Sequence, residues 1–144
     1  MALQIISADE RLAEKKGHKI VVCGPSGVGK TTLARTLNPQ TTLFMDLEAG
    51  DAAIENFPID VIRPRTWVEC RDFACFLGGG NPALSEDQPY SQAHYDYVAS
   101  MFGDSSDIWQ KYDSLFVDSI TVAGRLCFQW CLQQPEVRSD RSGK

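Results

Sequence analysis

The residues best suited to do chemistry lie in one glycine-rich segment near the start of the chain. Residues 24–31 read GPSGVGKT and match the pattern G-x-x-x-x-G-K-[ST] in full. Glycines let the backbone curl so that consecutive N–H groups point at an anion, and the dipole of the helix that follows also favours negative charge. The segment therefore predicts a phosphate-binding loop.

Position within this loop suggests a role for each polar side chain. Lys30 is expected to bridge the β- and γ-phosphates, Thr31 to offer its hydroxyl to Mg²⁺, and Thr32 to lie toward the α-phosphate. A chance glycine-rich turn is the alternative, but the pattern falls between an apolar run and a helix start, which is the context that the motif requires. The residues predicted to bind the nucleotide are Gly24, Pro25, Ser26, Gly27, Val28, Gly29, Lys30, Thr31 and Thr32.

A first acidic site follows the apolar run LFVD. Asp118 ends this run, which is the position of an aspartate that holds Mg²⁺ through water. The alternative is that Asp118 caps the helix that begins just after Ser119. With a phosphate-binding loop upstream, we favour the metal role for Asp118.

A second acidic site, Asp46-Leu47-Glu48, follows the run TTLFM. Ligands collect at the carboxyl ends of parallel strands, so both carboxylates are expected at the same edge of the sheet as the phosphate-binding loop. A carboxylate there can polarise the water that attacks the γ-phosphate, and Lys30 and Glu48 are the predicted catalytic residues. The alternative for Glu48 is a solvated acidic loop.

The elements that must position these residues follow from the hydrophobic pattern. Apolar runs bounded by turn signals predict four strands: Lys19–Cys23, Thr41–Asp46, Val61–Ile62 and Leu115–Asp118. Helical spacing and caps predict five helices: Ala8–Lys16, Lys30–Leu37, Trp67–Leu77, Ser91–Phe102 and Ile120–Gln133. Thr66 and Glu69 are in capping-box register, and a polar turn is expected after Gly103. Alternating strands and helices predict an α/β fold with a mainly parallel sheet flanked by helices.

Length and composition predict one ordinary globular domain. The chain has 144 residues, of which 43% are hydrophobic and 23% charged. We expect an N-terminal helical segment at 1–17, a nucleotide-binding domain at 18–133 with a flexible loop at 78–90, and a polar tail at 134–144. No apolar run reaches the ~18 residues of a membrane span, and the first residues do not form a secretion signal. A net charge of -5 argues against a surface built only to attract nucleic acid.

The cysteines favour a reducing compartment. There are five, an odd number, which predicts free thiols in a cytoplasmic protein. A zinc site with four cysteine ligands is an alternative, but the spacing of these cysteines is looser than in structural zinc sites.

Three segments taken in order resemble the RecA-like branch of P-loop ATPases. They are KIVVCGPSGVGKTTLA, TTLFMDLEAGD and SLFVDSITVAG, within residues 18–125. More narrowly, the chain is similar to bacteriophage-type nucleotide-binding proteins associated with single-strand annealing and recombination. The resemblance implies ATP and Mg²⁺ as ligands, Glu48 as the catalytic glutamate, Asp118-Ser119 as the end of Walker B, and the cytoplasm of a bacterial host as the location.

The resemblance also implies features at and beyond the end of this sequence. RecA-like cores insert a later strand between the Walker A and Walker B strands, and family members carry DNA-contacting loops beyond it. The helix after Asp118 and the polar tail leave no room for that strand before Lys144. We favour an incomplete core with a truncation in the tail, and a sheet that closes differently is the alternative.

Other functions and partners stay open from the sequence. A guanylate-kinase-like enzyme and a nucleotide-binding switch or adaptor without turnover are the alternatives to an ATPase. Arg63, Arg65 and Arg71 surround Trp67, a pattern that could bind single-stranded DNA but is more typical of a solvated surface with a core tryptophan. One of these arginines, or Arg125, is a candidate arginine finger in a homo-oligomer.

Overall fold

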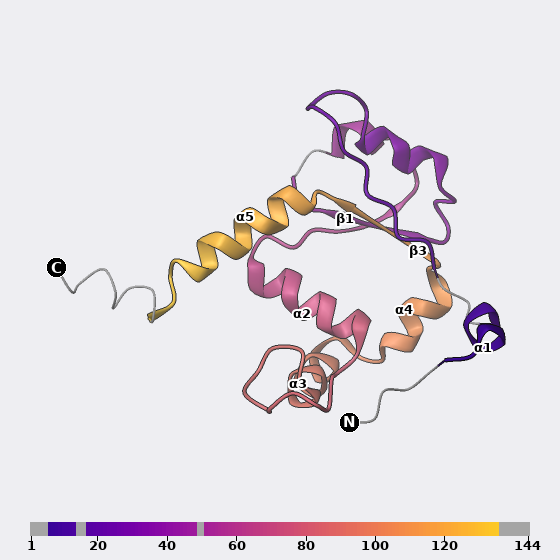
Figure 1. Ribbon diagram of the computed structural model, residues 1–144. Helices are drawn as coiled ribbons and strands as arrows, with labels where there is room; N and C mark the ends of the chain where they lie inside the picture. The colour runs from indigo at the N-terminus through magenta and orange to yellow at the C-terminus, as the bar shows by residue number, and fades with distance from the viewer. Residues whose placement is uncertain (1–5, 14–16, 49–50, 136–144) are drawn as a thin grey trace. The chain divides into compact units, whose positions relative to one another are not determined.

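The computed structural model describes residues 6–13, 17–48 and 51–135 (Figure 1). The chain divides into two compact units, Met1–Lys30 and Thr31–Lys144, which we describe separately. No helix in these described ranges is long and apolar enough to cross a lipid bilayer.

Among the residues of the first unit that the structure describes, one short helix is present, α1 (Ala8–Ala13). Its start is closed by reciprocal hydrogen bonds, because the N–H of Ser7 donates to Glu10 Oε2 and the N–H of Glu10 donates to Ser7 Oγ. The predicted helix Ala8–Lys16 is therefore confirmed as far as Ala13, and residues 14–16 lie outside the described residues.

The predicted strand Lys19–Cys23 is wrong. This stretch has no secondary structure, and Ile20 and Val21 are 81% and 80% exposed. A strand exists only through hydrogen bonds to a neighbouring strand, and the three strands among the described residues pair only with one another. The expected loop at 24–29 is confirmed as a series of turns and bends.

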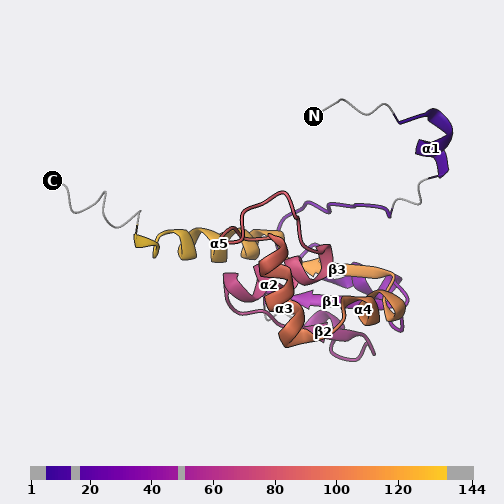
Figure 2. The ribbon, with the colours of Figure 1, turned by 90° about the horizontal axis from the view of Figure 1, so that it is seen from below.

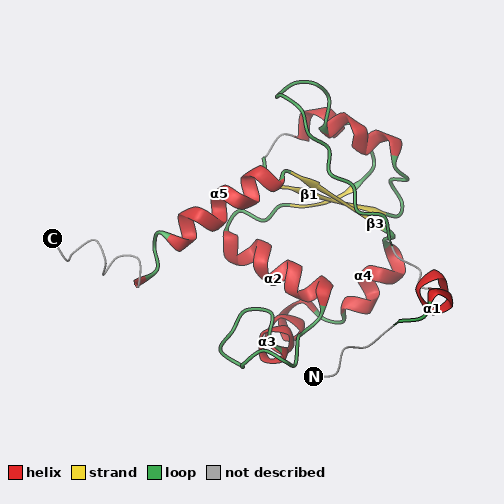
Figure 3. Ribbon diagram, viewed as in Figure 1, coloured by secondary structure: helices red, strands yellow, loops and turns green. Residues whose placement is uncertain are grey.

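The second unit is built on a three-stranded parallel sheet. Its strands are β1 (Thr42–Asp46), β2 (Asp60–Ile62) and β3 (Ser114–Asp118), in the order β2-β1-β3. All five residues of β1 are buried, as expected for a central strand covered on both faces (Figure 3). The predicted strands at Thr41–Asp46, Val61–Ile62 and Leu115–Asp118 are confirmed with shifts of one residue.

Helices cover both faces of the sheet. Two short 3₁₀ helices, η1 (Thr31–Thr36) and η2 (Asp51–Ile54), lie on one face, and α2 (Trp67–Gly78) and α5 (Ile120–Cys131) lie on the other (Figure 1). The predicted helix at 30–37 is therefore a 3₁₀ helix in the structure.

Side-chain alternation along β1 supplies a core to each face. Phe44 packs in the cluster under η1 and η2 and stacks on Phe116 with the ring centroids 5.2 Å apart. Its neighbour Met45 points the other way and packs with Cys70 of α2 and Leu126 of α5. The predicted α/β fold with a parallel sheet flanked by helices is thus confirmed.

Two more helices pack outside α2. Helix α3 (Gln92–Phe102) lies beside α2 (Figure 2). The ring of Phe102 in α3 meets that of Phe76 in α2 edge-on, with the ring centroids 5.6 Å apart. Helix α4 (Ser105–Lys111) occupies the stretch predicted as a polar turn, so that prediction is wrong. Asp104 caps α4, and the indole N–H of Trp109 donates to the Leu77 carbonyl, which supplies a tertiary contact that local propensity does not reveal.

The capping box of α2 is confirmed and generates a prediction about pH. Backbone N–H groups of Arg65 and then Thr66 hydrogen-bond the Glu69 carboxylate and hold its pKa below the ordinary 4.5. A carboxyl whose pKa is lowered on folding adds stability above its unfolded pKa, and this contribution is lost as the pH falls through the folded value. We expect Glu69→Gln to unfold at lower urea than the parent at about pH 7, and the difference to shrink at about pH 3.

The matched control removes the other half of the box. Thr66→Ala deletes the hydroxyl that accepts the Glu69 N–H and is expected to cost about 1 kcal/mol at both pH values. A Glu69→Gln difference that stays constant between the two pH values would contradict the assigned cause.

Candidate functional site

The glycine-rich loop of the first unit curls around the ammonium of Lys30. Lys30 Nζ donates to the carbonyl oxygens of Gly24 and Pro25 at 2.9 and 2.7 Å. Gly27 and Gly29 adopt φ of 80° and 92°, a region that residues with a Cβ rarely occupy. The two glycines therefore permit the turn that places the lysine at the end of the loop.

In the second unit the two predicted metal-ligating residues meet. The hydroxyl of Thr31, at the start of η1, donates to Asp118 Oδ2 at 2.5 Å. Asp118 is 7% exposed at the end of β3, and the residue that caps α5 is Ser119, so Asp118 is not the helix cap that was its alternative role. Thr31 and Asp118 are 87 positions apart in the sequence, and the fold places the hydroxyl of one next to the carboxylate of the other. Both groups are hard oxygen donors.

Glu48 lies beside the same strand end. The N–H of Leu47 donates to the Asp118 carbonyl at 2.7 Å and extends the pairing of β1 with β3 by one residue. Glu48 follows, exposed to solvent, and its Oε1 accepts a hydrogen bond from Ser119 Oγ at 2.6 Å. The structure thus brings Glu48 and Asp118 to one edge of the sheet.

Asp46 behaves differently from Glu48, and sequence reasoning missed its role. Its carboxylate is 1% exposed and is paired with two arginines, with Arg63 Nε at 3.2 Å and Arg65 Nη2 at 3.7 Å from Oδ2. Arg65 Nη1 also donates to the main-chain oxygen of Asp46 at 3.0 Å. The available signal was the sequence Arg-Pro-Arg directly after β2, because that strand is the parallel neighbour of β1.

The structure separates the three arginines that the sequence grouped around Trp67. Arg63 and Arg65 bind Asp46, whereas Arg71 donates through Nε and Nη2 to Asp72. Trp67 packs, partly buried, against the core cluster between the sheet and α2.

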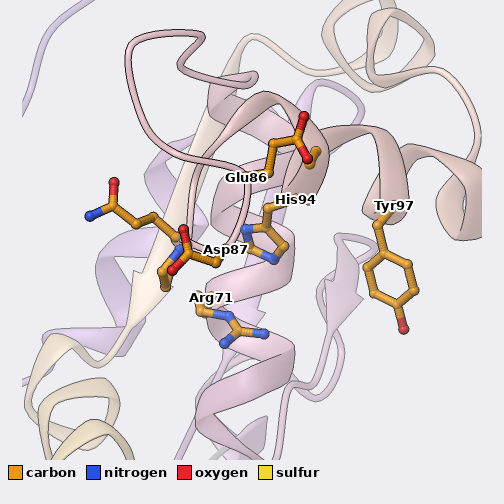
Figure 4. A pocket seen from close by; sticks show the side chains of 8 residues that line it. Arg71, Glu86, Asp87, His94 and Tyr97 are labelled. Carbon is orange, nitrogen blue, oxygen red and sulfur yellow. The ribbon is translucent and has the colours of Figure 1, made fainter.

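Arg71 also lines an open pocket of about 320 Å³ between α2, α3 and the loop that joins them (Figure 4). His94 Nε2 lies 3.0 Å from the Asp72 carboxylate, and His94 Nδ1 accepts the N–H of Tyr90. Because Nδ1 is an acceptor, the proton is on Nε2 and is donated to Asp72. None of the residues predicted to bind the nucleotide lines this pocket.

The cysteines do not form a metal site in the part of the chain that the structure describes. No group of three or more His, Cys, Asp or Glu residues there could hold a metal ion. Cys70 and Cys75 are buried, and burial raises the pKa of both thiols.

Thr31 and Asp118 fit a Mg²⁺ ion held together with a nucleotide. Magnesium is usually bound by one or two carboxylates together with substrate phosphates and water, and not by a cage of protein ligands. The hydroxyl and carboxylate oxygens of this pair are donors of the kind that Mg²⁺ prefers.

Comparison with known proteins supports the same interpretation. Residues 16–144 match a family model described as an AAA domain. Neither a curated protein nor a solved structure shows significant similarity to the chain. The match spans most of the chain and includes the glycine-rich loop, the parallel sheet and both acidic sites. The chain therefore belongs to the AAA domain family, whose members are P-loop ATPase-like domains.

Proposed function

We propose that this chain binds ATP with Mg²⁺ and hydrolyses it, as a RecA-like ATPase that acts in phage DNA recombination or single-strand annealing. The observation that carries the nucleotide part is the hydrogen bond between Thr31, which ends the loop motif, and Asp118, which ends β3. The family membership supports nucleotide binding. The recombination role rests on the resemblance of three sequence segments.

In the proposed complex with ATP and Mg²⁺, each part of the motif has a separate role. The N–H groups of the loop and the Lys30 ammonium neutralise the phosphates. Thr31 and Asp118 would hold Mg²⁺, which would supply charge neutralisation to the phosphate oxygens. The Thr31–Asp118 contact keeps both oxygen atoms in place before the ligand arrives.

Glu48 is assigned to hydrolysis. Its carboxylate orients a water molecule and accepts its proton as the water oxygen bonds to the γ-phosphorus. The bond from that phosphorus to the bridging oxygen breaks, and ADP and inorganic phosphate leave. The hydroxyl of Ser119 holds one carboxylate oxygen of Glu48, which restricts the rotation of the side chain.

The first prediction tests nucleotide binding. We expect ATP–Mg²⁺ to raise the melting temperature of the parent and Lys30→Ala to abolish the increase, because the ammonium no longer offsets the phosphate charge. Lys19→Ala, which changes an exposed lysine outside the motif, is the control and retains the increase. Stabilisation of Lys30→Ala equal to the parent would refute the assignment.

The second prediction tests the role of Glu48. In single-turnover ATP hydrolysis we expect Glu48→Gln to be slower by about 10²–10⁴-fold, the range typical of a lost general base, with ATP–Mg²⁺ binding unchanged. Glu55→Gln, at an exposed glutamate elsewhere in the unit, is the control. Hydrolysis at the parent rate would remove Glu48 from the mechanism.

The same measurements separate the alternatives. Equal protection by ATP and GTP without hydrolysis would favour a nucleotide-binding switch or adaptor. Phosphate transfer from ATP to GMP would favour a guanylate-kinase-like enzyme.

The third prediction concerns single-stranded DNA, which we propose as a partner of a homo-oligomer. Arg63 is one of the arginines that the sequence groups around Trp67, and its side chain is 49% exposed although it pairs with Asp46. We expect labelled single strands to bind with an affinity that falls as salt rises, and Arg63→Gln to reduce the salt slope by about one. Arg35→Gln is the control, and binding that does not depend on salt would contradict phosphate contacts.

A further inference from the structure

The net negative charge of the chain lies in one stretch of the second unit. Residues 79–113, which include α3 and α4, contain one basic side chain, Lys111, and six acidic ones: Glu86, Asp87, Asp96, Asp104, Asp107 and Asp113. This stretch therefore has a formal charge of -5, which equals that of the whole chain. All six acidic residues are exposed, whereas Lys111 is paired with Asp60 at 2.7 Å.

The same stretch carries large apolar side chains that its own packing leaves exposed. Four of them are at least half exposed: Tyr97 at 59%, Met101 at 50%, Phe102 at 55% and Trp109 at 51%. Tyr97 and Met101 are four positions apart in α3 and lie on one face of that helix. Phe102 and Trp109 both contact the last turn of α2. We call these four residues the α3–α4 surface.

The chemistry of the α3–α4 surface is that of a protein interface. Single exposed apolar residues are ordinary, but a group of large ones marks an interaction site, and tyrosine, tryptophan and methionine are enriched at interfaces. Three of the acidic residues, Asp96, Asp104 and Asp107, lie within two positions of a member of this surface. Their charge repels the phosphates of nucleic acids and of anionic lipids and attracts lysine and arginine.

The open pocket of about 320 Å³ adjoins this surface, because Tyr97 belongs to both (Figure 4). Glu86 and Asp87 also line the pocket and bring two exposed carboxylates to it. Arg71, which lines it too, donates two hydrogen bonds to Asp72, and this pairing offsets its positive charge. The pocket therefore combines an aromatic ring with negative charge, which suits the apolar stem and charged head of a lysine or arginine.

From this combination of charge and exposed apolar area we propose that the α3–α4 surface and the pocket bind a basic amphipathic segment of a partner protein. A lysine or arginine of that segment enters the pocket, where its methylene groups cover the Tyr97 ring and its charged head meets Glu86 and Asp87. The apolar residues of the segment cover the rest of the surface. None of the residues predicted to bind the nucleotide lines the pocket, and the inference does not depend on the proposed function.

The test measures the binding of three fluorescein-labelled peptides to the full chain by fluorescence anisotropy. The first is an amphipathic helical peptide of leucine and lysine, the second has glutamate in place of lysine, and the third has serine in place of leucine. We expect the first to bind with an affinity that falls as salt rises, because the ion pairs are exposed. The other two are expected to bind at least about tenfold more weakly, since one has the repelled charge and the other lacks apolar area.

Two matched pairs of variants locate the peptide on the protein. Tyr97→Ala is expected to weaken the leucine–lysine peptide about tenfold, whereas Phe128→Ala, which removes an exposed ring on α5, leaves its affinity unchanged. Glu86→Gln is expected to weaken it about threefold, as for one exposed ion pair, and Glu55→Gln leaves it unchanged. Melting curves of the four variants identify any loss of folding.

Several outcomes would overturn the inference. They are the absence of peptide binding, equal affinity for the lysine and glutamate peptides, and equal weakening by Tyr97→Ala and Phe128→Ala. Sedimentation of the parent provides a further check, because a dimer that Tyr97→Ala dissociates and Phe128→Ala does not would assign the surface to a second copy of the chain. These measurements contain no nucleotide, so their failure leaves the proposed function standing.

Discussion

The parallel pairing of β1 with β3 is the constraint on which the site depends. Its register sets Asp46 opposite Asp118 and continues through the Leu47 N–H to the Asp118 carbonyl. Glu48 and Ser119 then lie next to each other just after the two strands, and Ser119 Oγ donates a hydrogen bond to Glu48 Oε1. A shift of one residue in this register would turn Asp118 away from Thr31, because strand side chains alternate between faces.

The carboxylates at this edge of the sheet are stabilised in different ways. Three carboxylates, Asp46, Glu48 and Asp118, lie within a few residues of two paired strand ends. Asp46 is buried and needs cations, whereas Glu48 remains in solvent with a hydroxyl partner. Two neighbouring acids in sequence therefore acquire different surroundings, because only Glu48 stays in contact with solvent.

Much of the fold and part of the site were predictable from local pattern. The glycine-rich loop, the capping box of α2 and three strands follow from residue types at short spacing, which local physics governs. Helix α4 was missed because its polar sequence depends on the Trp109 contact with Leu77. The strand expected at Lys19–Cys23 was wrong because an apolar run cannot by itself provide the partner that a strand requires.

By itself, the sequence determined the phosphate-binding motif, the α/β class and the family, since each depends on residue type and order along the chain. Only the tertiary structure decided that Thr31 meets Asp118, that Glu48 is held by Ser119, and that Asp46 is buried beneath Arg63 and Arg65. The physical reason is that these contacts join residues from separate strands and helices. Strand register and desolvation, which a linear pattern does not encode, determine which carboxylate is buried and which remains in water.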